Sequence, residues 1–351
     1  MPTITADNLH DLTRRVLLAA GADDRNASRV ADALVLSNLS GVDTHGVFHL
    51  PRYVNEIREG MFVPTAWPEV VTETPTTALV SGNWTFGHVV AKYAMDVAIA
   101  KARDQNVATV SLVKAMHIGR VGEYAEMAVA NGMIALVWAS GYGAEVPVAV
   151  PFGGREPLLH TNPIAIGVPA GDETPMIMDF ATTRIAGSKV RTAQVKGEQV
   201  PAGSLVDEAG NPTTDPSGYP TSGGMIAFGE HKGYAFMLAD EFLGRVLAGA
   251  DGHVEGELGG SLMRRQGVTM IVFRADLFQP MADFARRSAE LKRQVNSVPP
   301  AAGFDQVLVP GDLEARAREK RSREGIPIPA EVWKTLTDLA DGLEVPVPPV
   351  T

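Results

Sequence analysis

The spacing of hydrophobic residues separates a helical beginning of the chain from a mixed centre. Apolar residues three and four positions apart predict helices at residues 5–20, 23–39 and 50–58. The inward positions are Leu9, Leu12, Val16 and Leu17 in the first helix and Ala27, Val30, Ala31, Leu34 and Val35 in the second. Residues 1–75 are therefore expected to form a helical N-terminal region that ends in an extended, proline-containing linker.

The centre of the chain alternates between β-prone runs and amphipathic segments. The predicted strands are residues 78–82, 107–113, 133–138, 176–179 and 268–273, and the predicted helices are residues 89–103, 124–130, 235–247 and 284–295. Residues 76–310 are therefore expected to form an α/β core, with a loop-rich excursion at 185–225. Residues 311–351 are expected to form a charged helical region that packs back on the N-terminal part.

Composition narrows the class of protein. The 351 residues are 45% hydrophobic and 21% charged, which is ordinary for a globular protein, and the net charge of -10 argues against non-specific nucleic-acid binding. The absence of cysteine excludes disulfides, thiolate zinc sites and cysteine nucleophiles. No signal peptide, membrane span or metal-ligand spacing is recognised, so a cytoplasmic enzyme or binding protein without a metal is expected.

The stretch from Asp43 to Tyr53 is the densest in candidate chemistry. It contains Thr44, His45, His49 and Arg52 in a Gly- and Pro-containing segment between two predicted helices. Histidine exchanges protons near neutral pH, and the planar guanidinium of arginine suits a carboxylate. From the residues alone, a structural helix-to-loop junction is as consistent with this pattern as a catalytic site.

Four further clusters follow predicted strands, where ligand sites often lie. They are Lys114–Glu123 with His117 and Arg120, Pro151–Pro163 with His160 and Thr161, Asp179–Thr183, and Phe228–Tyr234 with His231 and Lys232. Each also has a structural interpretation: a buried histidine, turn chemistry, a helix cap and a solvated lysine, respectively. None contains the Gly-x-Gly-x-x-Gly pattern of a Rossmann domain, so a conventional dinucleotide fold is not expected.

The order of the motifs resembles the malate/L-lactate dehydrogenase-like oxidoreductases, a non-Rossmann family. The matching segments are Thr44–Gly46, Leu50–Tyr53, His117–Gly122, Val150–Gly154, Thr161–Ala165, Asp179–Thr183, Lys196–Gly203, Pro212–Pro216 and His231–Tyr234. The resemblance runs from about residue 5 to Gly311 and is greatest to the hydroxycarboxylate dehydrogenase branch. It implies the family's own α/β fold for NAD or NADP, flanked by helical terminal regions, and a homodimer.

The resemblance also implies hydride transfer between the cofactor and a small 2-hydroxy or 2-oxo acid of the malate, lactate or aryl-lactate type. His45 matches the proton donor, Thr44 replaces a serine that supports it, and Lys189 falls at a relay position. The implied cofactor contacts are His117, which also has an acid/base role in some members, together with Gly119, Arg120, Asp179, Phe180, Ala181, His231 and Lys232. Thr161 matches a substrate contact.

Departures from the family pattern leave the substrate open. Many members carry an arginine at the position of His49, so Arg52, Arg120 or Arg184 is expected to hold the substrate carboxylate. His160 replaces a usual glycine, and Ser188 precedes Lys189 where glycine is common. Two alternatives remain: a reductase of cyclic imino acids, and an inactive relative that binds a metabolite. Arg286 and Arg287 could meet the 2′-phosphate of NADP, although basic pairs on a helix are mostly solvated.

Overall fold

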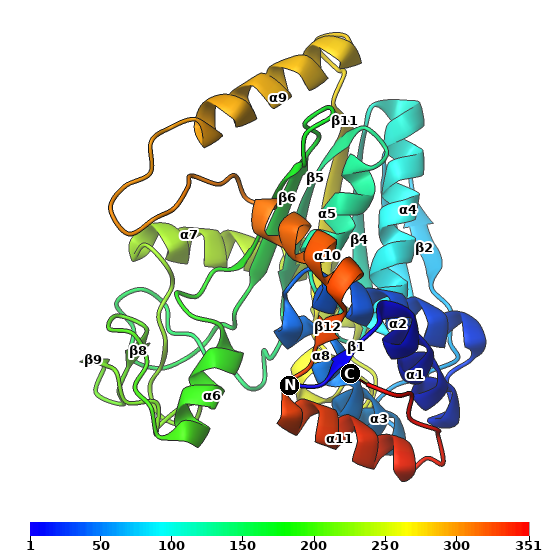
Figure 1. The fold of residues 1–351 in the computed structure, drawn as a ribbon, viewed down its shortest axis with the longest axis vertical. Helices are drawn as coiled ribbons and strands as arrows, with labels where there is room; N and C mark the ends of the chain where they lie inside the picture. Colours follow the sequence, from blue (N-terminus) through cyan, green and yellow to red (C-terminus); the bar gives the residue numbers. More distant parts are fainter. Residues whose placement is uncertain (351) are drawn as a thin grey trace.

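A seven-stranded mixed sheet forms the centre of the molecule in the computed structural model, which describes residues 1–350 (Figure 1). In spatial order the strands are β2 (Glu69–Glu73), β3 (Thr77–Thr85), β4 (Val107–Ala115), β11 (Gly267–Arg274), β5 (Met133–Ser140), β6 (Pro163–Val168) and β7 (Met176–Ala181). Only β3 and β4 pair in parallel. Strand β11 comes late in the chain but lies between β4 and β5, so it joins the two halves of the sheet.

Helices cover both faces of this sheet. On one face, α4 (Gly87–Gln105) packs on β3, β4 and β11, and α5 (Gly122–Val129) packs on β5 and β6. The buried positions Ala91, Ala94, Ala98 and Ala102 give α4 a smooth stripe that lies close to the sheet. On the other face lie α7 (His231–Asp240), the π-helical turn η3 (Glu241–Val246) and η4 (Ala250–His253).

The two ends of the chain build one helical layer. Strand β1 (Thr3–Ile4) pairs with β12 (Ile326–Pro327), and a single hydrophobic cluster contains residues from both ends. The N-terminal elements are α1 (Ala6–Ala19), α2 (Asp24–Leu39), η1 (Asp43–His45), η2 (Val47–His49) and α3 (Leu50–Arg58). The C-terminal elements are α10 (Asp312–Glu324), which contacts α2, and α11 (Ala330–Asp341), which contacts α1 and α3.

A small lobe extends from the sheet with a hydrophobic cluster of its own. It holds α6 (Gly187–Lys196) and a sheet of β8 (Leu205–Val206), β9 (Pro212–Thr213) and β10 (Gly224–Met225). The remaining helices are α8 (Gly260–Met263) and α9 (Met281–Asn296). No helix within residues 1–350 has the length and apolarity needed to cross a lipid bilayer.

The predicted α/β class with helical ends is confirmed. The predicted and observed elements differ mainly where few side chains are buried. The loop-rich stretch at 185–225 contains helix α6, which buries only Val190 and Ala193 and so shows no clear period. The proline-containing linker contains the mostly exposed edge strand β2, and β6 was also missed. The helix predicted at 235–247 begins four residues earlier, at His231, and becomes a π-helix after Asp240.

Candidate active site

A cavity of about 970 Å³ lies between the helical layer, the sheet and the small lobe. Its walls come from η1, α3, the loop after β4, strands β6 and β7, helix α6 and helix α11. Most residues singled out in the sequence line it: Thr44, His45, His49, Arg52, His117, Gly119, Arg120, Thr161, Asp179, Phe180, Ala181 and Lys189. Segments that are far apart in the sequence therefore share one space.

Three histidines form a cluster in this cavity. The ring centroids of His49 and His117 are 4.7 Å apart, and the His45 ring lies 6.2 Å from each. Burial, followed by the charge of Arg120, lowers the pKa of His45 to about 4. Burial also lowers the pKa of His49 to about 3 and that of His117 well below its usual value. All three imidazoles are therefore neutral at pH 7, and each has one unprotonated ring nitrogen.

Thr44 and Tyr53 contact the ring nitrogens of two of these histidines. The Thr44 hydroxyl lies 3.2 Å from Nδ1 of His45, and the Tyr53 hydroxyl lies 2.7 Å from Nδ1 of His117. Burial raises the pKa of Tyr53 well above its usual range, so its phenol keeps its proton and can donate it to Nδ1 in the tautomer of His117 that leaves Nδ1 unprotonated. A neutral His117 then carries its proton on Nε2. His117 can thus donate a hydrogen bond from Nε2 into the cavity.

Arg52 has a buried donor in this cavity that no group in the described part of the chain uses. Its Nε donates to Oε1 of Glu56 at 2.6 Å, while its buried Nη2 has no hydrogen-bond partner within residues 1–350. Arg120 also lines the cavity, and its buried Nε has no partner within residues 1–350, but its terminal Nη2 is held by Glu126 at 2.8 Å. Arg184 does not line the cavity at all. Among the three candidates for a carboxylate grip, Arg52 therefore fits best.

Asp179 closes the loop that carries His117 and Arg120. Its Oδ2 accepts the backbone N–H of Gly122 at 2.8 Å, at the beginning of α5. The positively polarised N-terminal end of α5 is thus capped by the protein's own carboxylate. Burial raises the pKa of Asp179 despite the nearby Arg120.

Helix α10 fastens both loops of the site from outside. Arg321 forms two bonds to the Asp43 carboxylate, of 2.6 and 3.0 Å, and also donates to the backbone oxygen of Asn38. The Asn38 side chain in turn holds Asp43 and the N–H of Val47, which encloses the His45 turn. Gly46 must be glycine here, because a Cβ would lie 2.1 Å from Oδ1 of Asn38.

The second contact of α10 is to the loop that carries Arg120. Arg318 forms two bonds to Glu126, of 2.7 and 3.0 Å, and Glu126 also holds Arg120. Sequence reasoning missed these supporting residues, since the partners are separated by 192 positions or more and no local pattern links them.

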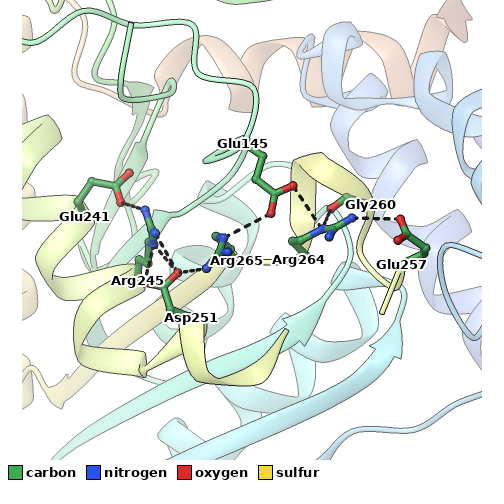
Figure 2. Close-up of polar contacts among 8 residues, drawn as sticks. All are labelled: Glu145, Glu241, Arg245, Asp251, Glu257, Gly260, Arg264 and Arg265. Atoms are coloured by element: carbon green, nitrogen blue, oxygen red, sulfur yellow. Dashed lines mark hydrogen bonds and ion pairs between the residues drawn. The ribbon is translucent and has the colours of Figure 1, made fainter. Parts of the chain in front are cut away.

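A chain of ion pairs supports another wall of the cavity. Figure 2 shows Glu145 between Arg264 and Arg265, with ion-pair distances of 3.5 and 3.4 Å. Arg265 continues to Asp251 at 3.0 Å. These pairs tie down the loop that carries Tyr142, a cavity residue that sequence reasoning also missed.

His231 and Lys232 are not brought into this cavity. They are exposed at the beginning of α7, where the His231 ring lies 5.9 Å from that of Phe152. Within one chain, His231 and Lys232 therefore cannot contact a cofactor bound in this cavity. The two arginines considered for the 2′-phosphate of NADP also lie outside this cavity. Arg286 pairs with Asp283 at 3.1 Å on α9, and neither Arg286 nor Arg287 lines the cavity.

Comparison with known proteins adds independent information. Residues 4–337 match the family model described as malate/L-lactate dehydrogenase. The chain is 34% identical to malate/(S)-sulfolactate dehydrogenase from Methanothermus fervidus over 97% of this chain and 98% of that one. It is 33% identical to hydroxycarboxylate dehydrogenase B from Escherichia coli, over 97% and 94%. The solved sulfolactate dehydrogenase from Methanocaldococcus jannaschii superposes with a TM-score of 0.88 at 32% identity, over 99% and 98% of the two chains.

Proposed function

Because this chain belongs to the malate/L-lactate dehydrogenase family, we propose that it is an oxidoreductase acting on a small 2-hydroxy acid or the matching 2-oxo acid, with a nicotinamide cofactor. One observation carries the proposal at the level of the site. The neutral imidazole of His45 and the unpartnered Nη2 of Arg52 face the same cavity. A proton acceptor and a carboxylate-binding group are what oxidation of a 2-hydroxy acid requires from the protein.

The cavity fits a nicotinamide cofactor together with a small acid. Its volume of about 970 Å³ lies near the upper end of the roughly 300–1,000 Å³ usual for small-molecule sites. We propose that Gly119, Asp179, Phe180 and Ala181 hold the cofactor, since all four line the cavity that contains the histidine cluster. When bound, the nicotinamide supplies the hydride acceptor or donor. Both NAD and NADP are kept as candidates.

The residues of this chain would then act as follows. Arg52 binds the substrate carboxylate, and His117 donates from Nε2 to the substrate oxygen. Neutral His45, oriented by Thr44, takes the hydroxyl proton during oxidation. In the reverse direction His45 must first gain a proton, and an anionic substrate favours this by offsetting nearby positive charge. In that direction His45 is the proton donor that the family resemblance implies.

Two more predicted residues are given roles here. We propose that Thr161 contacts the substrate, since it lines the cavity beside His160. Lys189 is exposed on α6, lines the same cavity and has no ion pair within residues 1–350, so its charge favours an anionic ligand. Division of the chain near residues 75 and 310 and a cytoplasmic location remain predictions.

The test is a panel of 2-oxo acids and a cyclic imino acid, each assayed with NADH and NADPH. Turnover of 2-oxo acids is expected, and His45→Ala should lower it by about 100-fold or more while cofactor binding persists. The matched control is His10→Ala, because His10 pairs with Asp32 on the outside of the N-terminal helices. Wild-type turnover by the His45 variant would refute the role of His45. Turnover of the imino acid alone would favour the reductase alternative.

We also propose a homodimer, supported by an apolar stripe on α7 and η3. Phe236, Phe242, Val246 and Leu247 are 46–59% exposed, and Phe242 and Val246 lie four positions apart. Polar side chains at its edge already pair with each other, as Arg245 does with Asp251 (Figure 2). An apolar centre with a satisfied polar rim is typical of an interface.

Light scattering on the purified protein tests the dimer. Phe242→Asp should shift a dimer toward monomer, whereas Val195→Asp, at an 88% exposed apolar position on α6, should not. A monomeric wild type would refute the proposal.

A further inference from the structure

The cavity has more positive charge than the proposed reaction explains. Arg52 and Arg120 are paired with Glu56 and Glu126. Arg191, which lies on α6 and lines the same cavity, has neither an ion pair nor a side-chain hydrogen bond within residues 1–350. Arg191 is exposed, so its charge is available at the cavity to an anionic group from outside the chain.

Arg191 and Arg52 come from opposite sides of the site. Figure 1 shows α6 in the small lobe and α3 in the helical layer, well separated across the lower part of the molecule. Each guanidinium nevertheless acts on His160, because both charges add to burial in lowering the pKa of His160 to about 3. Arg191 acts in the same way on Tyr219, a second cavity residue. Its charge is thus directed at the cavity.

Two aromatic rings line the same cavity as the two arginines. The rings of Tyr142 and His160 are perpendicular, with centroids 4.1 Å apart, and Nδ1 of His160 lies 3.2 Å from the Thr161 hydroxyl. Gly143 admits His160 closely, since a Cβ there would lie 2.4 Å from its ring. The His160 ring is therefore fixed and neutral, and it borders the ligand space as a rigid wall.

We propose that Arg191 binds a second anionic group at the far end of the substrate, while Arg52 holds the carboxylate next to the reacting carbon. The preferred substrate is then a dianionic 2-hydroxy or 2-oxo acid whose distal group is a carboxylate or a sulfonate. This inference rests on the proposed function and assigns its specificity to Arg191, with His160 and Tyr142 as the wall between the two anion sites.

The expected preference arises because a charged and a neutral distal group of the substrate interact differently with Arg191. A distal carboxylate or sulfonate accepts charge-assisted hydrogen bonds from the guanidinium of Arg191. A neutral side chain of the same length offers no acceptor and partly desolvates the arginine without compensation. A site built around a polar partner discriminates well against an analogue that lacks it.

The experiment compares oxaloacetate with 2-oxobutyrate, which has the same number of carbons but no distal charge. In Arg191→Gln, kcat/KM for oxaloacetate should fall about 10- to 100-fold, the worth of one hydrogen bond to a charged group. The value for 2-oxobutyrate and the KM for the cofactor should be unchanged. Arg191→Lys should retain part of the preference, because it keeps the charge but loses the planar fork.

The matched control is Lys196→Gln, which removes an exposed charge from the same helix outside the cavity. Equal losses on both acids would show that Arg191 binds the shared carboxylate, and a raised cofactor KM alone would assign Arg191 to the cofactor. Either result, or no change at all, overturns the proposal. If the wild type reduces no 2-oxo acid, the proposed function fails; if it reduces both and Arg191→Gln leaves their ratio unaltered, only the second anion site fails.

Discussion

The contact between Arg321 and Asp43 gives a sharp test of how the His45 turn is held. Arg321→Met removes both bonds to the Asp43 carboxylate, of 2.6 and 3.0 Å, and the bond to the Asn38 backbone oxygen. Met keeps much of the apolar stem, so the loss falls mainly on the charged head. Arg321 never touches the cavity, and we therefore regard it as a positioning residue.

The magnitude follows from the geometry and the exposure of this pair. The contact is bidentate, which places it among the stronger ion pairs, but the side chains are 18% and 37% exposed, which weakens it. A loss of about 1–2 kcal/mol is expected, which corresponds to a factor of roughly 5–30 in the population of the ordered turn. We expect kcat to fall within this range, because a misplaced His45 accepts the proton less often.

The assay measures kcat, KM and the denaturation midpoint side by side. Arg321→Lys should recover part of kcat, since it restores the charge without the fork. Arg323→Met is the matched control, because Arg323 lies on the same helix and pairs only with exposed Glu324. If Arg321→Met keeps wild-type kcat, or if Arg323→Met loses as much, the reasoning is wrong.

Two other outcomes follow from the histidine cluster. Tyr53→Phe removes the hydroxyl that donates to His117 and leaves Nδ1 without that partner, so kcat/KM should fall roughly tenfold while Tyr93→Phe on α4 changes nothing; equal activity of both variants would refute this. Because burial lowers the pKa of His45 from 6.5 to about 4, the unfolded chain takes up this proton first as the pH falls. Urea denaturation should therefore show a free energy of unfolding that declines between pH 6.5 and about 4, with a smaller slope in His45→Gln; an identical slope would contradict the assignment.

The sequence predicted elements whose burial follows a regular period and missed those without one. The helix predicted at 89–103 is rich in alanine, and these alanines form the buried face of α4, whereas α6 and β2 bury too little to leave a pattern. The candidate residues near His45 and His117 were visible because reactive side chains stood in glycine-containing loops. Pairs such as Arg321 with Asp43 were not, because nothing local records a contact across 278 positions.

The late position of β11 and the meeting of the two chain ends have a consequence for biosynthesis. During translation β4 and β5 cannot be joined until residues 267–274 have left the ribosome, since β11 lies between them. The cavity wall is finished later still, because Glu331, Val332 and Thr335 of α11 contribute to it. The nascent chain therefore carries its reactive histidines for most of synthesis without an enclosed pocket, and a ribosome that stalls before residue 335 releases a product without its last wall.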